Sequence, residues 1–364
     1  MLSVNNINLE ATMINSFNDI QLLFQAVKQT PKLDKLYCIL FVYNSPETMS
    51  DVFHESECVF DEELNMIISS FRKIAKNVYS IDGETEFLKR IPGLKQKYKY
   101  ILVYSMAQNI VGNGRRSLIP LLCDYYQLIN IGADFMSCTF GRSKDIMYFL
   151  LNPKDIPFPE TYYIYDDEVI VDILPKIKTG KWLLKPNNES SSIGMEVHTF
   201  DGYSIDKVKE YLYDYHKKYP VFCVQKFIDG EEVAVPILKI NDRYYCPGIS
   251  QVAFPKGKNY IDYDMVALES YGYFEYSGPI REQLVNISVE VAKSLNLTAM
   301  SRIDFRICNN IPYIEDIGAN PTISESNGVN QLYCDYLQAE PWCVYAILVY
   351  AALIEHRLFK PPFH

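Results

Sequence analysis

The sequence lacks the residue patterns of several common site types and protein classes. Its nine cysteines include no C-x-x-C pair, and its five histidines include no H-E-x-x-H arrangement. These absences argue against a disulfide framework, a zinc site and a histidine metal centre, and they favour a reducing compartment with buried or free thiols. No apolar run approaches the roughly 20 residues that span a bilayer, and the N-terminus lacks the basic-then-apolar layout of a signal peptide. We therefore expect a cytoplasmic protein that contacts no membrane.

The chain also lacks a basic excess. It has 35 Lys and Arg against 45 Asp and Glu, a formal net charge of −10, whereas nonspecific binding to nucleic acid needs a basic face. A small polyanion such as a nucleotide is not excluded, because it needs only a few local lysines. The 364 residues, 48% hydrophobic and 22% charged, predict a globular protein of two or three structural units without a nucleic-acid partner.

The N-terminal part alternates between buried strands and a helix. Residues 36–43 form a continuous apolar run that stops at an Asn-Ser-Pro turn, which is typical of a buried parallel strand. Helical spacing follows over 62–75, and two more short strands follow over 77–81 and 98–105. This alternation predicts an open α/β layer, in which ligands bind beyond the carboxyl ends of the strands.

The loop after the third of these strands carries two arginines. Arg115 and Arg116 follow Gly112 and Gly114. Paired arginines can hold a carboxylate or a phosphate through two parallel hydrogen bonds. A solvated loop before the predicted helix over 117–126 would carry the same residues, so both interpretations stay open at this point.

The stretch from Trp182 to Met195 has the layout of a phosphate-binding loop. An apolar run ends in Lys185, three consecutive serines follow over 190–192, and Gly194 closes the loop. A buried strand that delivers one lysine into a loop of unobstructed amides can hold phosphate. A β-hairpin with a polar, solvated turn would have the same residues, and the stretch alone favours neither.

An acidic hairpin is predicted near the end of the chain. Strands over 300–307 and 312–317 are joined by an Asn-Asn turn, since asparagine tolerates the positive φ of tight turns. Folding this hairpin places Asp304 near Glu315 and Asp316. Carboxylates this close repel one another unless a proton or a cation intervenes, and oxygen ligands on rigid strands suit Mg²⁺ that also contacts phosphate. The alternative is an acidic face paired with the arginines of the same hairpin.

These pieces occur in a recognisable order. A helix lysine, Lys144, comes first, then the strand lysine with its Ser-rich loop, a Gln-Lys-Phe-Ile-Asp-Gly-Glu-Glu segment over 225–232, and the acidic hairpin with its Arg-x-Asp sequence over 302–304. In this combination the chain resembles the ATP-grasp superfamily and, within it, the D-alanine–D-alanine ligase-like carboxylate–amine ligases. The resemblance runs from about Leu36 to the C-terminus.

The resemblance implies a fold. It is an α/β fold with α+β lobes, in which an N-terminal open α/β pre-ATP-grasp domain precedes two lobes that clasp ATP. The expected spans are 1–138 for the N-terminal domain, 139–226 for the central lobe with the phosphate lid, and 227–364 for the C-terminal lobe with the metal site and the substrate loop.

The resemblance also implies roles for individual residues. ATP would be held by Lys144, Leu183, Lys185, Ser190, Ser191, Ser192, Met195, Gln225, Lys226, Phe227, Ile228 and Glu232. One or two Mg²⁺, for which Mn²⁺ could substitute, would be bound by Asp304, Glu315, Asp316 and Asn320. The catalytic residues would be Arg302, which steadies the acyl phosphate, with Ser191 and Lys258. The substrates would contact Arg115, Arg116, Tyr263, Arg302, Ser324, Ser326 and Asn327.

The closing motif of the family fits this chain in two ways. In the family it is Glu-x-Asn, a few residues before a proline. Counting back from Pro321 makes Asp316 the acid and puts Gly318 in the asparagine position. Counting through the Asn-Asn turn instead pairs Asp304 with Glu315. Both registers stay open, and the asparagine before the proline is the candidate replacement for the missing amide ligand.

Two further departures concern the substrates. The lysine and tyrosine of the family's substrate-covering loop are Val266 and Ala267 here, with Lys256 or Lys258 as candidates to compensate. The N-terminal acidic residue that orients the first D-alanine in the family is not found. We therefore expect substrates other than a pair of D-alanines.

The resulting hypothesis is an ATP- and Mg²⁺-dependent carboxylate–amine ligase that forms an amide through an acyl phosphate, acting on amino acids or a short peptide. One alternative is an ATP-grasp enzyme that modifies a larger peptide or protein acceptor. Another is a nucleotide-binding protein without ligase activity. The expected partners are small-molecule or peptide carboxylates and amines, and a homodimer is a candidate assembly because homodimers are common among the relatives.

Overall fold

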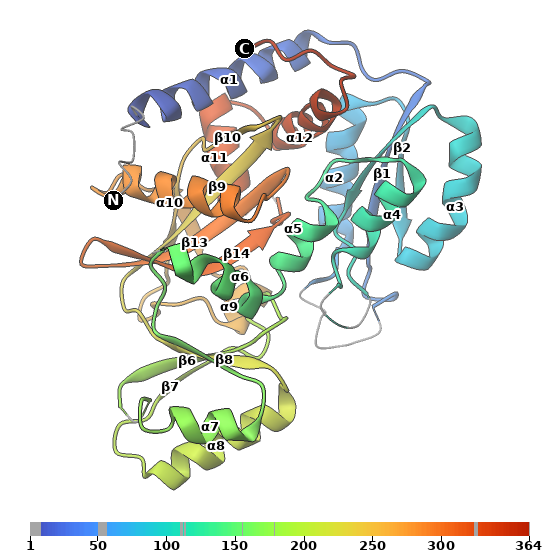
Figure 1. The fold of residues 1–364 in the computed structure, drawn as a ribbon. Helices are drawn as coiled ribbons and strands as arrows, with labels where there is room; N and C mark the ends of the chain where they lie inside the picture. Colours follow the sequence, from blue (N-terminus) through green and yellow to red (C-terminus); the bar gives the residue numbers. More distant parts are fainter. Residues whose placement is uncertain are drawn as a thin grey trace.

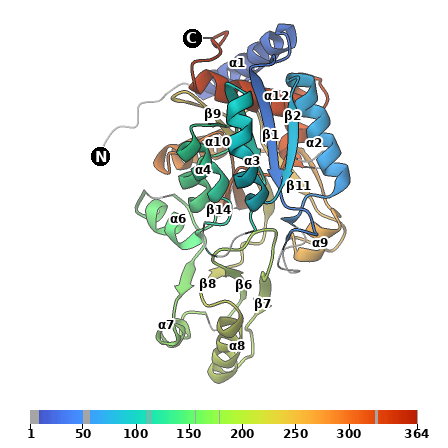
Figure 2. The same cartoon turned by 90° about the vertical axis from the view of Figure 1, so that its right-hand side faces the viewer.

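The structure is a computed structural model of the chain, and it describes residues 9–49, 57–109, 112, 114–154, 156–177, 179–323 and 327–363. Three β-sheets organise these residues. Figure 1 shows the N-terminal and C-terminal parts side by side in the upper half of the molecule, with the central segment, coloured green to yellow, below them. The view in Figure 2 shows the same two-level arrangement from the side.

The N-terminal unit is the predicted open α/β layer. Its parallel strands lie in the order β2-β1-β3-β4. The strands are β1 (Tyr37–Tyr43), β2 (Val78–Asp82), β3 (Tyr100–Ser105) and β4 (Ile129–Asn130). The helices are α1 (Leu9–Gln29), α2 (Asp61–Ile74), α3 (Glu84–Lys97), α4 (Leu118–Tyr126) and α5 (Phe135–Phe140).

The apolar run of β1 is buried on both faces of its sheet. Ile39 and Phe41 pack into a core with α1, α2 and the C-terminal helices, whereas Cys38, Leu40 and Val42 pack into a second core with α3 and α4. A strand covered by helices on both faces has no solvent side, which is why its sequence is continuously apolar and does not alternate.

The central unit is an antiparallel sheet that forms its own core with α7 and α8. Its strands lie in the order β5-β8-β6-β7. Its elements are α6 (Lys144–Leu151), η2 (Asn152–Lys154), β5 (Thr161–Ile164), α7 (Asp167–Ile173), β6 (Lys181–Pro186), β7 (Glu196–Thr199), α8 (Ile205–Lys218) and β8 (Phe222–Lys226). The fully buried Trp182, Phe200 and Phe222 belong to this core.

The C-terminal unit is built on a six-stranded sheet. Its main order is β12-β11-β9-β13-β14, and β10 pairs with β9. Its elements are β9 (Glu231–Ile240), β10 (Arg243–Tyr245), β11 (Ser250–Ala253), α9 (Tyr263–Ala267), β12 (Gly272–Glu275), α10 (Arg281–Ser294), β13 (Met300–Cys308), β14 (Ile311–Ala319), α11 (Gly328–Leu337) and α12 (Trp342–Glu355). The sequence pattern suggests one strand over 243–250, but the structure has β10 and the start of β11 there.

The N-terminal and C-terminal units share one hydrophobic core. Residues 343–354 of α12 are all buried and pack with α1, α2 and the β1 face of the N-terminal sheet. The predicted α/β fold with its three parts is confirmed, and each sheet falls within one of the predicted spans. The domain boundaries at residues 138 and 226 stay a prediction.

Among the described ranges, no single helix is both long and apolar enough to cross a membrane, and only α11 and α12 together, bent by 91°, reach that length and composition.

Candidate active site

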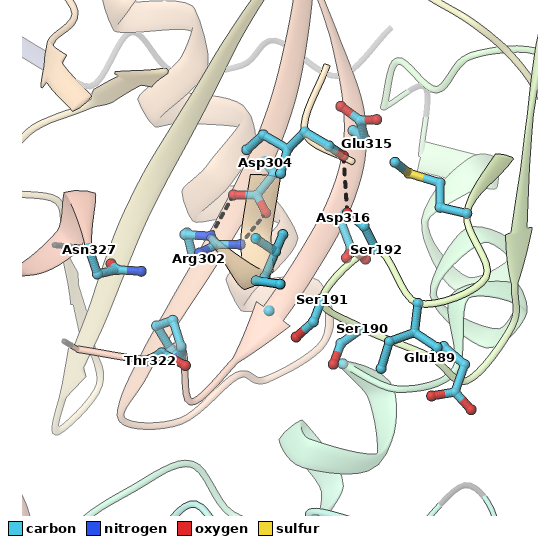
Figure 3. A pocket seen from close by; sticks show the side chains of 18 of the residues that line it. Glu189, Ser190, Ser191, Ser192, Arg302, Asp304, Glu315, Asp316, Thr322 and Asn327 are labelled. Carbon is cyan, nitrogen blue, oxygen red and sulfur yellow. Dashed lines mark hydrogen bonds and ion pairs between the residues drawn. The ribbon is translucent and has the colours of Figure 1, made fainter. Parts of the chain in front are cut away.

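A cavity of about 1030 Å³ lies where the three units meet. Its walls come from α2, from the hairpin β13–β14, from the segment around α9, and from residues 187–195 between β6 and β7, which we call the lid. Figure 3 shows Arg302 and Asp304 on one side of the cavity and the lid serines Ser190–Ser192 on another.

Two lysines of the central unit line the cavity. Lys144, the first residue of α6, donates through Nζ to the Glu189 carbonyl at 2.6 Å. Lys185, at the end of the buried strand β6, donates to the Glu315 carbonyl at 3.2 Å and lies 3.4 Å from Oε1 of the same residue. Burial opposes the charge on Lys185, but the carboxylates of Glu315 and Asp316 raise its pKa. Both lysines are therefore placed to neutralise an anion in the cavity.

The lid is shaped by left-handed backbone. Ser191 and Ser192 have φ of 54° and 56°, and Gly194 has φ of 69°. A Cβ at Gly194 would lie 2.5 Å from the Tyr219 ring, so the close approach also requires glycine. The amides of Ser191 and Ser192 donate to no acceptor among the described residues, and successive free amides form an anion-binding concavity. The Ser192 hydroxyl donates to the Ile261 carbonyl at 3.0 Å, which connects the lid to the C-terminal unit.

The opposite wall is the hairpin β13–β14, and it contains a β-bulge. Asp304 lies opposite Asp316, and Phe305 lies opposite Ile314, so the register shifts at Glu315. Adjacent residues of a regular strand point to opposite faces of the sheet. Because the bulge inserts one residue, Glu315 and Asp316 both line the cavity.

This register settles how the closing motif fits. Asp304 lies opposite Asp316, the residue that counting back from Pro321 makes the acid of the motif, and Gly318 lies opposite Arg302. The alternative pairing of Asp304 with Glu315 is wrong, because it assumes a hairpin without a bulge. The turn itself is as predicted, with φ of 52° and 61° at its two asparagines.

Arg302 and Asp304 form a bidentate ion pair in the cavity wall, marked by dashed lines in Figure 3. Nε and Nη2 of Arg302 each donate to one carboxylate oxygen of Asp304 at 2.7 Å. Burial raises the pKa of Asp304, and the guanidinium opposes this shift. A guanidinium has five N–H donors, so Arg302 is oriented by Asp304 and still has donors for a ligand.

The predicted metal ligands are only partly brought together. Glu315 and Asp316 lie beside Lys185, and Oε2 of Glu315 is buried without a hydrogen-bond partner in the described part of the chain. Asp304 is occupied by Arg302. Within the described residues no group of three His, Cys, Asp or Glu side chains is gathered to hold a metal. Glu315 and Asp316 nevertheless fit Mg²⁺, because this ion commonly binds through one or two carboxylates together with substrate phosphates, and Lys144 and Lys185 are placed to hold such phosphates.

Asn320 is not part of this group, contrary to the prediction. Its Nδ2 donates to the Ser105 carbonyl at 2.9 Å, and a Cβ on Gly132 would lie 2.7 Å from its Oδ1. The backbone turns at Asn320, which has φ of 54°. The side chain therefore packs against the N-terminal unit and away from the acidic residues.

Most of the predicted nucleotide-binding side chains line the cavity. Leu183, Met195 and Phe227 are apolar lining residues, as expected for a base-binding wall. Glu232 also lines it and forms an ion pair with Arg306 at 2.9 Å. Burial and the charge of Glu315 raise the pKa of Glu232.

Three of the predicted ATP-binding residues, Gln225, Lys226 and Ile228, do not line this cavity. Gln225 is buried in the sheet and donates through Nε2 to Thr161 at 3.0 Å. The Lys226 amide donates to the Glu160 carbonyl at 2.7 Å, and its ammonium lies over the Trp182 ring at 4.8 Å. Ile228 is also absent from the lining residues. Gln225 lines a small second pocket together with Lys144, Lys185 and Glu315. The base contacts expected of Lys226 and Ile228 involve their main chain and stay a prediction.

The predicted substrate residues are divided between the cavity and its surroundings. Arg116 and Asn327 line the cavity, and the Asn327 side chain caps α11 by accepting from the Val329 amide at 2.9 Å. Ser324 and Ser326 lie outside the described residues.

Lys258 and Tyr263 are not brought to the cavity. Lys258 pairs with Asp262, and its side chain is 46% exposed. Asp262 also caps α9 by accepting from the Met265 amide at 2.9 Å. Lys258 is not among the residues that line the cavity, and its catalytic role stays a prediction. Tyr263 opens α9 and is 37% exposed.

The sequence interpretation missed a buried acid, Glu57, that joins the N-terminal unit to the lid. Its carboxylate accepts from Arg115 and Arg142, each at 2.9 Å, and from the Ser190 hydroxyl. Arg115 also pairs with Glu189 at 3.1 Å, so it is occupied by carboxylates and does not line the cavity. We call these five residues the lid latch. The only sign of it in the sequence is the adjacent pair Arg115 and Arg116, and no pattern around Glu57 marks that acid as their partner.

Comparisons with known proteins agree with this geometry. Residues 178–333 match the family profile described as D-ala D-ala ligase C-terminus. A D-alanine–D-alanine ligase from Aquifex aeolicus is 22% identical over 279 residues, covering 72% of this chain and 89% of the relative. The crystal structure of D-alanine–D-alanine ligase from Bacillus anthracis complexed with ATP matches with a TM-score of 0.64 at 15% identity, covering 90% of this chain and 99% of that one.

The chain has the ATP-grasp fold. A second ATP-grasp structure, the VanG D-Ala:D-Ser ligase from Enterococcus faecalis, matches with a TM-score of 0.62 at 14% identity, covering 88% of this chain and all of that one. The predicted family is confirmed, as is the enzyme class, an ATP-dependent ligase of the ATP-grasp type that forms carbon–nitrogen bonds and whose family uses ATP with a divalent metal.

One sequence-based expectation about this ATP-grasp ligase is overturned. We expected substrates other than a pair of D-alanines, because Val266 and Ala267 replace two family residues and no N-terminal acid was found. The relatives and structural neighbours that match nearly their whole length include D-alanine–D-alanine ligases and the VanG D-Ala:D-Ser ligase. The N-terminal unit moreover supplies an acid, Glu57, that the sequence pattern does not reveal. Single departures in one loop therefore did not justify excluding D-alanine.

Proposed function

We propose that this ATP-grasp ligase joins two D-alanine molecules, one as acyl donor and one as amine acceptor, with conversion of ATP to ADP and phosphate. The observation that carries the proposal is the pairing, across one cavity, of a lysine-and-amide wall with the Arg302–Asp304 wall. The first wall suits a polyphosphate, and the second suits a developing negative charge on an acyl group.

In this proposal ATP lies against the central unit. Lys144 and Lys185 contact its phosphates, and the amides of Ser191 and Ser192 close over them. The base packs among the apolar lining residues of the lid side, and Glu232 binds the ribose hydroxyls. The buried, cationic state of Lys185 supports this placement, because its charge is already maintained by Glu315 and Asp316.

The reaction has two steps. A carboxylate oxygen of the donor D-alanine attacks the γ-phosphorus, and the bond to the β-phosphate oxygen breaks to release ADP. The amine of the acceptor, after losing a proton, attacks the acyl carbon, and the carbon–oxygen bond to phosphate breaks. Arg302 donates to the oxygen on which negative charge develops, and Asp304 keeps the guanidinium in that orientation.

Glu315 and Asp316 would hold a divalent cation, expected to be Mg²⁺, and this cation would neutralise phosphate charge. Lys144 and Lys185 lower the pKa of Asp316 despite its burial, so its carboxylate is available as an ionised ligand. Asp304 is a further candidate once a ligand engages Arg302.

The test is to incubate the protein with ATP, Mg²⁺ and D-alanine and to measure ADP, phosphate and dipeptide together. The expected result is one ADP and one phosphate for each D-alanyl-D-alanine. L-Alanine is the matched control for chirality, and D-serine tests how strictly the acceptor is chosen. Release of AMP, or dipeptide formation from L-alanine only, would exclude the proposed reaction.

The proposal also separates the two rival functions raised by the sequence. A modifier of larger acceptors would release ADP only when a peptide or protein is added. A nucleotide-binding protein without ligase activity would bind ATP and release no ADP with any amino acid. We also propose that the enzyme is cytoplasmic and forms a homodimer, and light scattering of the purified protein tests the dimer.

A further inference from the structure

Two arginines form a second cationic group in the cavity wall, apart from the lysines that face the phosphates. Arg116 follows β3 in the N-terminal unit, and Arg142 lies just before α6. Both line the cavity, and Arg142 is only 4% exposed. We call them the arginine pair.

A single glutamine holds the arginine pair together. Oε1 of the fully buried Gln108 accepts from Nε of Arg116 at 3.1 Å and also from Nη2 of Arg142. Nη1 of Arg142 and Nε2 of Gln108 are buried and have no hydrogen-bond partner among the described residues. Buried donors without acceptors are costly. The group therefore contains donors that no described residue satisfies, beside a cavity that both arginines line.

The positive charge of the arginine pair is only partly balanced by protein. Glu57 pairs with Arg142 but shares its charge with Arg115. Arg116 donates to neutral oxygens, those of Gln108 and the Asn320 backbone, and forms no ion pair with any described carboxylate. Burial and the neighbouring Arg142 lower the pKa of Arg116. Each of these observations indicates that an anion would complete the group.

The arginine pair lies at the substrate end of the cavity. Arg116 donates to the Asn320 carbonyl at 3.0 Å, directly after the strand in which Gly318 lies opposite Arg302. The cavity lining continues from there to Thr322 and Asn327. An anion bound to the arginine pair therefore lies on the Arg302 side of the cavity, where the acyl group reacts. Lys144 and Lys185 remain available to bind the nucleotide.

The surrounding charge favours a carboxylate over a phosphate. Glu63 and Glu269 also line the cavity, and Oε1 of Glu63 is buried without a partner. Glu269, and Glu63 in its ionised form, would repel a dianionic phosphate. A zwitterionic amino acid, in contrast, can direct its carboxylate to the arginines and its ammonium toward Glu63.

We propose that Arg116 and Arg142 bind a substrate carboxylate that takes no part in the reaction. This inference rests on the proposed function, in which the amine acceptor is an amino acid. The carboxylate is either the α-carboxylate of the acceptor or the side-chain carboxylate of an acidic acceptor. The arginine pair is then a specificity determinant, since an acceptor without this carboxylate leaves Arg116 without an ionic partner and Nη1 of Arg142 without an acceptor.

A competition between acceptors tests the subsite. The enzyme receives ATP, Mg²⁺, D-alanine and an equal concentration of D-alaninamide, and mass spectrometry measures the ratio of the two dipeptide products. For the unmodified protein the carboxylate acceptor should prevail. In Arg116→Gln, which keeps hydrogen-bond donors but removes the charge, the ratio should shift toward the amide product by about 10- to 100-fold. This ratio is independent of ATP binding and of the overall rate.

The controls separate binding from folding. Arg281→Gln removes an arginine that pairs with Glu275 at 2.9 Å outside the cavity and should leave the ratio unchanged. Arg116→Lys, which keeps the charge, should recover part of the preference. D-Aspartate and D-glutamate in place of D-alaninamide distinguish the two carboxylate sources. If Arg116→Gln lowers the share of product formed from D-aspartate and D-glutamate and changes no other ratio, the arginine pair binds the side-chain carboxylate. An unchanged product ratio with every acceptor overturns the subsite.

A binding measurement keeps the subsite testable if no ligation occurs. Propionate, which has a carboxylate and no amine, should raise the Tm of the unmodified protein and of Arg281→Gln, and it should leave that of Arg116→Gln unchanged. Propionamide should raise none of them. Equal shifts with propionate in all three proteins refute the subsite, whereas a selective shift without ligation refutes only the proposed reaction.

Discussion

The lid latch makes Glu57 the buried charge whose removal should cost the most stability. Its side chain is 1% exposed and accepts from two guanidiniums and one hydroxyl. In Glu57→Gln the negative charge is lost while Arg115 and Arg142 stay buried beside a side-chain NH2 that cannot accept. Removing one partner of a buried ion pair typically costs about 3–5 kcal/mol.

The pH dependence gives an independent magnitude for the same interaction. Burial opposes ionisation of Glu57, but the neighbouring arginines and Ser190 lower its pKa from 4.5 to about 2. A difference of this size corresponds to about 3 kcal/mol. Because the folded pKa is the lower one, this stability is fully present above pH 4.5 and is lost as the pH falls toward 2. Both routes therefore predict a loss of about 3 kcal/mol at pH 7.

Urea unfolding of the unmodified protein and of Glu57→Gln, at pH 7 and at pH 3, measures this effect. Glu86→Gln is the matched control, because Glu86 forms an exposed pair with Arg90 at 2.7 Å and should lose no more than about 0.5 kcal/mol. Glu57→Gln should lose several times as much at pH 7, and the difference from the unmodified protein should shrink at pH 3. A loss equal to that of the control, or one that does not depend on pH, would refute the assignment of Glu57 as a buried ionised partner.

Three further predictions concern the cavity wall and the lid. Burial raises the pKa of Glu63 to about 7. The folded protein therefore keeps its full stability below pH 4.5 and is destabilised as the pH rises through 7, where Glu63 must ionise while buried. At pH 8, urea unfolding should show Glu63→Gln to be more stable than the unmodified protein by up to about 3 kcal/mol. Lys185→Met removes a buried charge facing the expected phosphates and should lower kcat/KM for ATP by about 10- to 100-fold in an ADP-release assay; an unchanged value would contradict its role. Gly194→Ala meets the Tyr219 ring at 2.5 Å, whereas Gly202→Ala, also at positive φ, meets nothing within 4 Å. Both variants place alanine at positive φ, so Gly202→Ala controls for the backbone strain. Gly194→Ala should raise the KM for ATP more than Gly202→Ala does, and an equal rise in both variants would contradict a tightly packed lid.

The parts of the site that could be predicted are those encoded in one contiguous segment. The lid is such a segment, since β6 delivers Lys185 and the following residues supply small side chains and glycine. Leu183 and Met195 flank the same loop, so their presence in the cavity follows from the same short stretch. The Asn-Asn turn likewise fixes its own geometry, because asparagine adopts left-handed backbone readily.

The parts that could not be predicted depend on distant segments meeting or on one inserted residue. The latch joins Glu57 to Arg142, which is 85 positions away, and no local pattern predicts that contact. The bulge at Glu315 changes which residues share a face, and a hydrophobic pattern does not reveal an insertion of one polar residue. Asn320 shows the same limit, since its partner in β3 is 215 positions away.

The shared core of the first and last parts of the chain has a consequence for synthesis. The inward face of β1, with Ile39 and Phe41, is covered by α12, which leaves the ribosome long after β1 does. The central unit closes its own core with residues 164–224 alone. We therefore expect the central unit to fold first during translation, while the N-terminal sheet keeps an apolar face uncovered until residues 342–355 emerge. In the cell this order makes the nascent N-terminal unit a natural client of chaperones.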